Sequence, residues 1–245
     1  MVQATDTRIA ALEAELAALR AEMQEFTYTV SHDLRAPLRH ILSFAQLVQE
    51  DAGHLLNPEV QGFLDTIGGS ARHMGLLLDG LTALSRLGTV QVDRCPVSLQ
   101  SVVEEVCAEL REQQGQRNIT WHVAGDLPVV VVDPNLLRQA LQHVLGNAVK
   151  FTAGRDLASI EVGMVPAPDP HTVTLQVRDN GVGFNPAQQP QLFRVFGRLH
   201  SAQQFEGIGM GLVLTRKIMQ RLGGAVQIEG AVDTACSVRL SLPLG

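Results

Sequence analysis

A histidine followed directly by an acid is the first place in the chain where the residue types could do chemistry. In Ser31-His32-Asp33 the carboxylate of Asp33 could orient one imidazole nitrogen of His32 and leave the other nitrogen as a nucleophile. The chain has eight histidines, and a histidine taken alone is more often a surface residue. The pair therefore gains weight only if other residues point to the same chemistry.

Three polar residues lie on one face of a helix that we expect at 136–151. His143, Asn147 and Lys150 are spaced four and three residues apart, so their side chains share that face. An amide oxygen and an ammonium group there could serve a metal ion and phosphate groups. The alternative is a solvated polar stripe. Because 17 of the 19 basic residues are Arg, a Lys at 150 suggests that this place needs a compact point charge.

A carboxylate at the end of an expected strand is followed by two glycines. In Asp179-Asn180-Gly181-Val182-Gly183 the glycines would let a purine approach the backbone, and Asp179 could accept a hydrogen bond from the purine amino group. Taken alone, this pattern is more typical of a hairpin or an Asx turn.

A second glycine pattern opens a later helix. Gly207, Gly209 and Gly211 alternate with other residues just before a helical pattern, so bare backbone N–H groups could face a phosphate at the helix N-terminus. Such glycines also mark ordinary tight turns, and the motif is weak when it stands alone.

The first 87 residues predict two long helices, the first of which carries His32 and Asp33. Apolar residues in alternating steps of three and four predict a coiled coil, and Pro37 should kink this helix without ending it. Breakers at 51–58 predict a turn, and a second helical pattern follows at 60–84. Two helices cannot bury so wide an apolar stripe alone, so we expect a dimeric four-helix bundle. The coiled-coil positions are Ile9, Leu12, Leu16, Leu19, Met23, Phe26 and Val30.

From about residue 90 the pattern becomes mixed. Strands in pairs with intervening helices predict an α/β sandwich, with one sheet covered by helices. We expect helices at 99–113, 136–151 and 211–222, and strands at 119–123, 129–132, 160–165, 173–177, 226–229 and 238–242.

Composition excludes several classes of function. The chain has 245 residues, of which 45% are hydrophobic, so a folded core is expected. The net charge of -6 argues against a nucleic-acid or anionic-membrane binder. Three scattered cysteines fit a reducing cytoplasm and no disulfide framework. No apolar run approaches the roughly 18–20 residues that a membrane span needs, and no signal peptide opens the chain.

Five segments together resemble the transmitter module of two-component sensor histidine kinases. The match extends from about residue 24 to the end, and its phrasing is most similar to the phytochrome-type (bacteriophytochrome) kinases. Each segment is weak alone, but five in register are specific. In order, the H, N, G1, F and G2 boxes are matched by SHDLRAPL (31–38), HVLGNAVKFT (143–152), DNGVGF (179–184), LFRVFGRL (192–199) and EGIGMGL (206–212).

The resemblance implies a fold and a division of the chain. Residues 1–25 would be a coiled-coil signalling helix that leads in, and 26–88 a helical hairpin for dimerisation and histidine phosphotransfer. Residues 89–245 would be a catalytic domain with the Bergerat-type (GHKL) α/β sandwich that binds ATP.

The resemblance also implies residue roles. His32 would accept the γ-phosphoryl group of ATP, with Asp33 as general base. Asn147 would hold Mg²⁺, Lys150 would contact phosphate, and Asp179 would read the adenine amino group. The same boxes give further nucleotide-binding positions at His143, Phe151, Gly181, Gly183, Gly207, Gly209 and Gly211, with the first two glycines as hinges of an ATP lid and the last three closing it. Phe193 and Phe196 would be the F-box aromatics that help dock the two domains.

Two positions depart from the family pattern. The N box usually begins with Asn, where this chain has His143, whose imidazole could still donate to a phosphate. The fourth residue after the phospho-acceptor is usually Thr or Asn, which positions water for dephosphorylation of the partner. Here it is Ala36, so phosphatase activity by that route is in doubt.

These features predict a cytoplasmic, homodimeric, ATP- and Mg²⁺-dependent histidine kinase output module. Its partners would be the receiver domain of a response regulator and a sensor domain in the same or another chain. One alternative is another GHKL ATPase, such as the gyrase B and MutL families, which would explain the N, G1 and G2 boxes but not the H box. A second alternative is a degenerate transmitter that acts as a scaffold or phosphatase.

Overall fold

The computed structural model describes residues 2–115, 117–167, 169–201 and 203–244. Residues 1–89 and 90–245 form two compact units, each with its own internal contacts. In the described ranges no helix is both long and apolar enough to cross a membrane.

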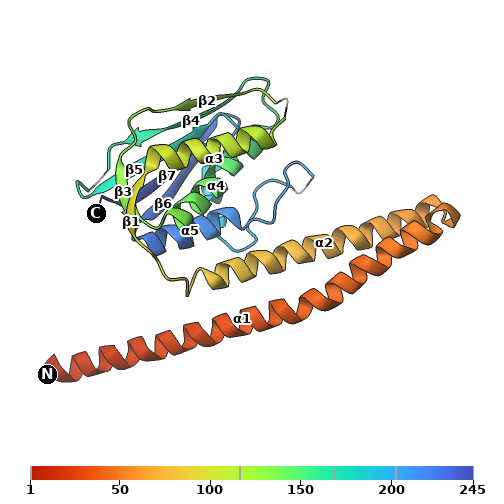
Figure 1. The fold of residues 1–245 in the computed structure, drawn as a ribbon, viewed down its shortest axis with the longest axis horizontal. Coiled ribbons are helices and arrows are strands. Elements are labelled where there is room, and N and C mark those ends of the chain that lie inside the picture. Colours follow the sequence, from red (N-terminus) through yellow and green to blue (C-terminus); the bar gives the residue numbers. More distant parts are fainter. Residues whose placement is uncertain (1, 116, 168, 202, 245) are drawn as a thin grey trace. The chain divides into compact units, whose positions relative to one another are not determined.

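The first unit is a helical hairpin (Figure 1). Helix α1 (Val2–Ala52) continues through Pro37, as the sequence predicted. A short 3₁₀ helix, η1 (Gly53–Leu55), makes the turn, and α2 (Pro58–Arg86) returns along α1. The side chain of Asn57 caps α2 by accepting a hydrogen bond from the Val60 amide at 2.9 Å, and Pro58 occupies the first turn, where its missing N–H costs nothing.

Large apolar side chains remain exposed along the hairpin of the single chain. Met23 and Phe44 are both 66% exposed, and the positions of the coiled-coil repeat are all at least 38% exposed. Few side chains of the hairpin, such as Leu38 and Ala71, are buried. An exposed apolar stripe of this kind is typical of helices that pack against a partner surface.

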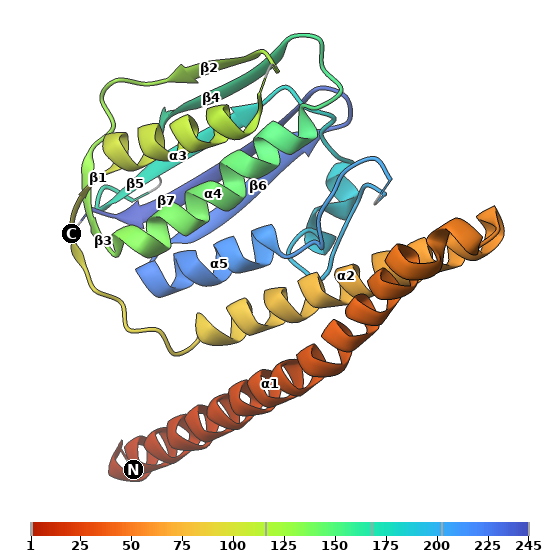
Figure 2. The same cartoon turned by 45° about the vertical axis from the view of Figure 1, so that its right-hand side comes forward.

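The second unit is an α/β sandwich with its helices on one face of the main sheet (Figure 2). The five-stranded sheet has the order β2-β4-β5-β7-β6, in which β2 and β4 are parallel and the other neighbours antiparallel. Its strands are β2 (Ile119–Val123), β4 (Ala158–Val165), β5 (Thr172–Asp179), β6 (Ala225–Ala231) and β7 (Ala235–Pro243). The helices are α3 (Leu99–Gln113), α4 (Pro134–Phe151) and α5 (Gly211–Leu222).

The expectation of a single sheet was wrong in one respect. Strand β3 (Val129–Val132) does not join the main sheet but pairs with β1 (Cys95–Ser98) in a separate two-stranded ribbon. Strand β1 could not be predicted from the sequence, because it has only four residues and contains Pro96. The 3₁₀ helix η2 (Pro186–Gln191) was also missed, since its two prolines are typical of a loop.

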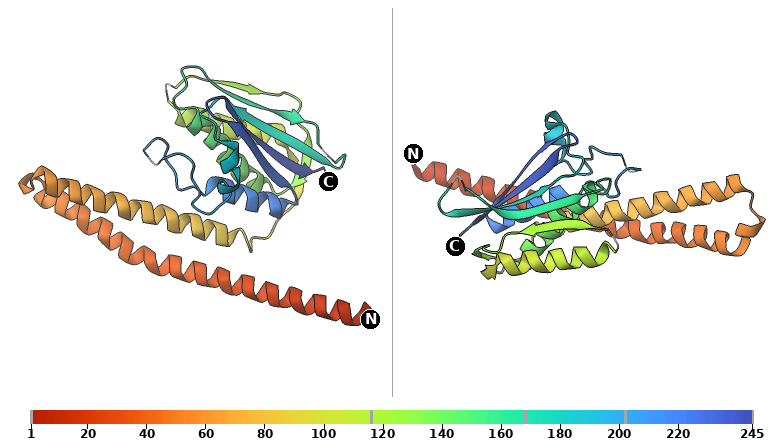
Figure 3. Two further views of the ribbon diagram at one scale, coloured as in Figure 1. Left: turned by 180° about the vertical axis from the view of Figure 1, so that it is seen from behind. Right: turned by 90° about the horizontal axis from the view of Figure 1, so that it is seen from above.

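The core of the α/β unit lies between the sheet and the helices (Figure 3). Leu137, Leu141 and Leu145 of α4 are completely buried, and they repeat every four residues along one side of the helix. Sheet residues such as Ile160 and Leu240 are equally buried. Because its inner face is fixed in this way, α4 presents its polar face in a defined orientation.

Candidate phosphotransfer and nucleotide sites

The H box lies in the middle of α1 with its histidine open to solvent. The side chain of His32 is 69% exposed, and its Nδ1 lies 3.2 Å from Oδ1 of Asp33. An ionised carboxylate can only accept, so in a neutral imidazole this contact favours the tautomer that carries its proton on Nδ1. In the described chain Nε2 has no hydrogen-bond partner, and its lone pair is free to act as a nucleophile.

Neighbouring side chains fix the H-box turn to the second helix. Arg35 donates to Oδ1 of Asp79 at 3.0 Å and to the hydroxyl of Thr82 at 3.3 Å. Tyr28, one turn before His32, stacks on its ring with 6.4 Å between centroids. Ala36, one turn after His32, is exposed and offers only a methyl group.

The N box is positioned by the way α4 begins. Oδ1 of Asp133 accepts hydrogen bonds from the amides of Asn135 and Leu136, and Pro134 occupies the first turn. The helix carries His143 and Lys150 on its partly exposed side. Burial lowers the pKa of His143, which favours its neutral form. Burial and then the nearby charge of Arg198 lower the pKa of Lys150.

The G1 turn holds a carboxylate at the end of β5 that is only 6% exposed. The amide of Gly181 donates to Oδ1 of Asp179 at 2.8 Å. Burial raises the pKa of Asp179 to about 6, and this hydrogen bond opposes the shift. The backbone that follows Asp179 is tightly packed, because a Cβ on Gly181 would lie 2.7 Å from the carbonyl oxygen of Phe151. Gly183 has a φ of +57°, and a Cβ there would lie 1.9 Å from the oxygen of Ala231.

The G2 glycines approach the polar face of α4. A Cβ on Gly207 would lie 3.5 Å from Nζ of Lys150, and one on Gly211 would lie 3.5 Å from Nδ2 of Asn147. Gly209 has a φ of +74° and also passes close to the backbone of the F box. Backbone N–H groups at the start of α5 are therefore adjacent to the N-box amide and ammonium, an arrangement suited to phosphate.

The F box is held by α5 within the same unit. Arg216 lies over the ring of Phe193 at 5.1 Å and donates to the carbonyl of that residue at 2.9 Å. Phe196 has a φ of +61°, which is uncommon for a bulky residue, and its backbone is the one that Gly209 approaches.

The structure adds two residues to which the sequence analysis gave no role. Arg198 donates to the carbonyls of Phe205 at 2.6 Å and of Gly207, and, in addition to burial, its charge lies near enough to lower the pKa of Lys150. Its place inside the F-box segment was the available signal. Cys236 pairs with Asp179 across β5 and β7, and burial, then the Asp179 charge, raise its pKa to about 12. Nothing in the sequence alone indicated this pairing.

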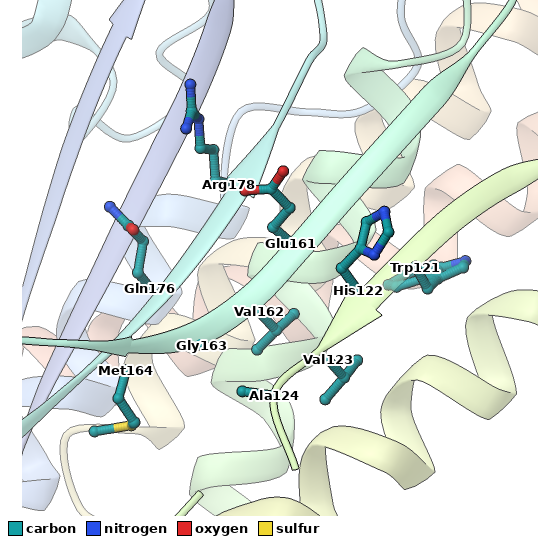
Figure 4. A pocket seen from close by; sticks show the side chains of 10 residues that line it. All are labelled: Trp121, His122, Val123, Ala124, Glu161, Val162, Gly163, Met164, Gln176 and Arg178. Carbon is teal, nitrogen blue, oxygen red and sulfur yellow. The ribbon is translucent and has the colours of Figure 1, made fainter. Parts of the chain in front are cut away.

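A hollow of about 620 Å³ lies elsewhere, on strands β2, β4 and β5 (Figure 4). Its polar side chains include His122, Glu161, Gln176 and Arg178. None of the N, G1 or G2 box residues lines it, so this hollow is separate from those three boxes.

Two known families match the hairpin and the α/β unit separately. The model of the His Kinase A (phospho-acceptor) domain matches residues 22–89. The model of the histidine kinase-, DNA gyrase B- and HSP90-like ATPase matches residues 132–245. The helical hairpin and the α/β sandwich are therefore the two parts of a histidine kinase transmitter, and the predicted fold class is confirmed.

Individual relatives support the same assignment. The chain is 33% identical to the methanogenesis regulatory histidine kinase FilI of Methanothrix harundinacea, over 94% of this chain and 25% of FilI. It is 31% identical to cyanobacterial phytochrome B of Nostoc, over 90% of this chain and 29% of the phytochrome. The crystal structure of full-length ShkA in complex with AMPPNP is similar, with a TM-score of 0.63 and 27% identity, over 90% of this chain and 46% of ShkA.

The chain belongs to the sensor histidine kinases, and the predicted resemblance to their transmitter module is confirmed; its relatives include phytochrome-type kinases. It spans about a quarter to a third of the length of these curated relatives.

Proposed function

We propose that this chain binds ATP in its α/β unit, phosphorylates His32 within a homodimer and passes the phosphoryl group to an aspartate of a response regulator. The observation that carries this proposal is the assembly of the N, G1 and G2 residues around one end of α4, in a chain whose exposed His32 is oriented by Asp33.

The nucleotide would be held by the residues that the boxes supply. Asp179 would accept a hydrogen bond from the adenine amino group, and the ring of Phe151 would contact the base. Lys150 and His143 would face the phosphates, together with the backbone amides around Gly207, Gly209 and Gly211. The tight packing of Gly181 and Gly183 supports a fixed base end of the site, because side chains at either position would collide with backbone.

The side chains present fit one magnesium ion held mainly by the nucleotide. The described residues contain no group of three His, Cys, Asp or Glu side chains that could bind a metal by themselves. Mg²⁺ commonly takes one or two protein oxygens and completes its shell with phosphates and water. Asn147 would supply one amide oxygen, and the bound ion would neutralise charge on the phosphates during transfer.

The transfer step needs little covalent help from the protein. Nε2 of His32 would attack the γ-phosphorus, the bond from that phosphorus to the bridging oxygen would break, and ADP would leave. Asp33 would accept the hydrogen bond of the Nδ1 proton and stabilise the positive charge that develops on the imidazole. The phosphoryl group would then move to a carboxylate of the receiver domain, which frees His32.

The remaining expectations concern the whole assembly. We propose that residues 1–25 form the signalling helix, that 26–88 dimerise and carry the phosphate, and that 89–245 bind ATP. The exposed apolar stripe of the hairpin supports a homodimer. An upstream sensor domain and a cytoplasmic location complete the proposal. The alternative of a gyrase-like ATPase is not favoured, because it leaves the match of 22–89 unexplained.

The test is incubation of the purified chain with γ-labelled ATP and Mg²⁺, followed by transfer to a purified receiver domain. We expect label on the chain that is lost in acid and is stable in base, as a phosphoramidate should be. Label that survives acid treatment, or ATP hydrolysis without any labelled protein, would contradict the proposed kinase activity.

A further inference from the structure

Three rings from distant parts of the α/β unit form a closed aromatic cluster beside the N box. The ring of Phe151, at the end of α4, lies 5.1 Å from Phe205 and 5.5 Å from His200. His200 and Phe205 lie 5.4 Å apart, so each ring contacts both of the others. The last two belong to the loop that joins η2 to α5, and neither was singled out by the five sequence boxes.

A hydrogen bond ties this loop to the G1 turn. Nε2 of His200 lies 3.0 Å from the carbonyl oxygen of Gly183, which can only accept, so His200 is the donor. The acceptor is rigid, because Gly183 is packed against the backbone of Ala231 with no room for a side chain. His200 therefore connects the loop to the most closely packed part of the nucleotide site.

One ring of the cluster, that of Phe151, also contacts a charged group, the ammonium of Lys150. Nζ of Lys150 lies 4.3 Å from the centroid of Phe151, a cation–π contact. Arg198 of the same loop donates to the carbonyl of Phe205 and brings its own charge near Lys150. One end of the cluster thus meets the cations that would face phosphate, and the other meets the turn that follows Asp179.

We propose that His200 and Phe205 complete the base end of the nucleotide site. Together with Phe151 they form the apolar wall against which the nucleobase packs, and the hydrogen bond of His200 holds the loop in place. This inference rests on the proposed function, since it assigns further residues to the same ATP site. It predicts that the wall recognises the size of the base, whereas Asp179 recognises its amino group.

Adenine and cytosine separate these two contributions. Both carry an exocyclic amino group, so Asp179 can accept a hydrogen bond from either base. Adenine has two fused rings and gains more from an aromatic wall than cytosine does. Loss of the wall should therefore weaken ADP binding more than CDP binding, and a merely structural disturbance of the unit would weaken both equally.

The first experiment needs no nucleotide. Amide hydrogen exchange is compared for the wild type, His200→Ala and the control His171→Ala, which removes an exposed histidine of the same unit. We expect exchange in the loop around Phe205 to rise about two- to tenfold in His200→Ala only, which corresponds to the loss of one net hydrogen bond. Equal loop exchange in all three proteins would overturn the role of His200.

The second experiment measures ADP and CDP dissociation constants by calorimetry for the same proteins and for Phe205→Ala and Phe205→Tyr. We expect the preference for ADP over CDP to fall roughly fivefold or more in His200→Ala and Phe205→Ala, in keeping with base–aromatic stacking. Phe205→Tyr should restore the preference, because it keeps the ring.

An unchanged preference in both alanine variants would overturn the inference even if the loop loosens. Absence of ADP binding in the wild type would instead contradict the proposed function. The exchange comparison would still decide whether His200 holds the loop.

Discussion

The two units of this chain bury their apolar side chains to very different degrees. In the α/β unit, side chains such as Leu141, Ile160 and Leu240 are completely buried within a single chain. In the hairpin, Phe26 and Phe63 remain 63% and 58% exposed. The α/β unit therefore has a complete core of its own, while the hairpin exposes an apolar stripe of the kind that a partner surface covers. We therefore propose that the α/β unit can bind ATP without a partner chain, whereas the surroundings of His32 depend on the proposed homodimer.

The largest effect is expected when a core side chain is removed from the α/β unit. Leu141→Ala should lower the free energy of unfolding of the α/β unit by about 2–5 kcal/mol, because the surrounding side chains cannot close the cavity. Thermal or denaturant unfolding measures this free energy, with the fluorescence of the single tryptophan, Trp121, as the probe. The exposed Leu47→Ala is the matched control and should leave this transition unchanged. An equal shift in both variants would contradict two separately folded units.

Asp179→Asn should separate function from stability within the α/β unit. An amide presents a donor as well as an acceptor to the adenine amino group, so ADP affinity should fall by tenfold or more. The measurement is calorimetric titration of the full chain with ADP. Unchanged affinity would show that Asp179 does not read the base.

The same variant should be more stable than the wild type without nucleotide. Burial raises the pKa of Asp179 from 3.8 to about 6, so the folded protein takes up a proton between these values that the unfolded chain does not. The wild type therefore loses stability as pH rises through this range, by roughly 3 kcal/mol at most. The advantage of Asp179→Asn should grow from pH 4 to pH 6 and level off above. A stability advantage of Asp179→Asn that shrinks as pH rises would contradict a raised pKa of Asp179 in the folded protein.

Removal of residues 1–25 should weaken dimerisation of the hairpin without affecting the α/β unit. The deleted segment carries exposed apolar residues, including Leu12, Leu16 and Met23, which would pack in a dimeric coiled coil. We expect a weaker dimer by sedimentation equilibrium and unchanged unfolding of the α/β unit. A dimer dissociation constant equal to that of the full chain would show that the remaining hairpin suffices.

The smallest effect is expected at Ala36, which faces outward one turn after His32. A hydroxyl or amide there could hold a water for attack on the phosphorylated receiver. Ala36→Thr and Ala36→Asn should speed dephosphorylation of the receiver by up to about tenfold, the value of one hydrogen bond, with autophosphorylation largely unchanged. Decay of purified phosphorylated receiver measures it. If neither variant changes the decay, another group places the water.

The sequence predicted the helices and most strands because their apolar periods are regular. The bounds expected for α3, β2, β3 and α5 agree with the structure. It could not predict β1, whose pairing with β3 depends on residues 31 or more positions away. The ring contacts of His200 and Phe205 were likewise hidden, because they join a loop to the end of α4 through tertiary packing. The roles at His32 and Asp179 came from motif order, which a single residue does not reveal.

The most direct test of the account compares His32→Gln with His40→Gln, which lies on the same helix and is also exposed. Each variant chain is incubated with γ-labelled ATP, and ADP binding is measured in parallel. We expect that His32→Gln incorporates no acid-labile label yet binds ADP as the wild type does, while His40→Gln is labelled normally. Normal labelling of His32→Gln would contradict the assignment of the phospho-acceptor.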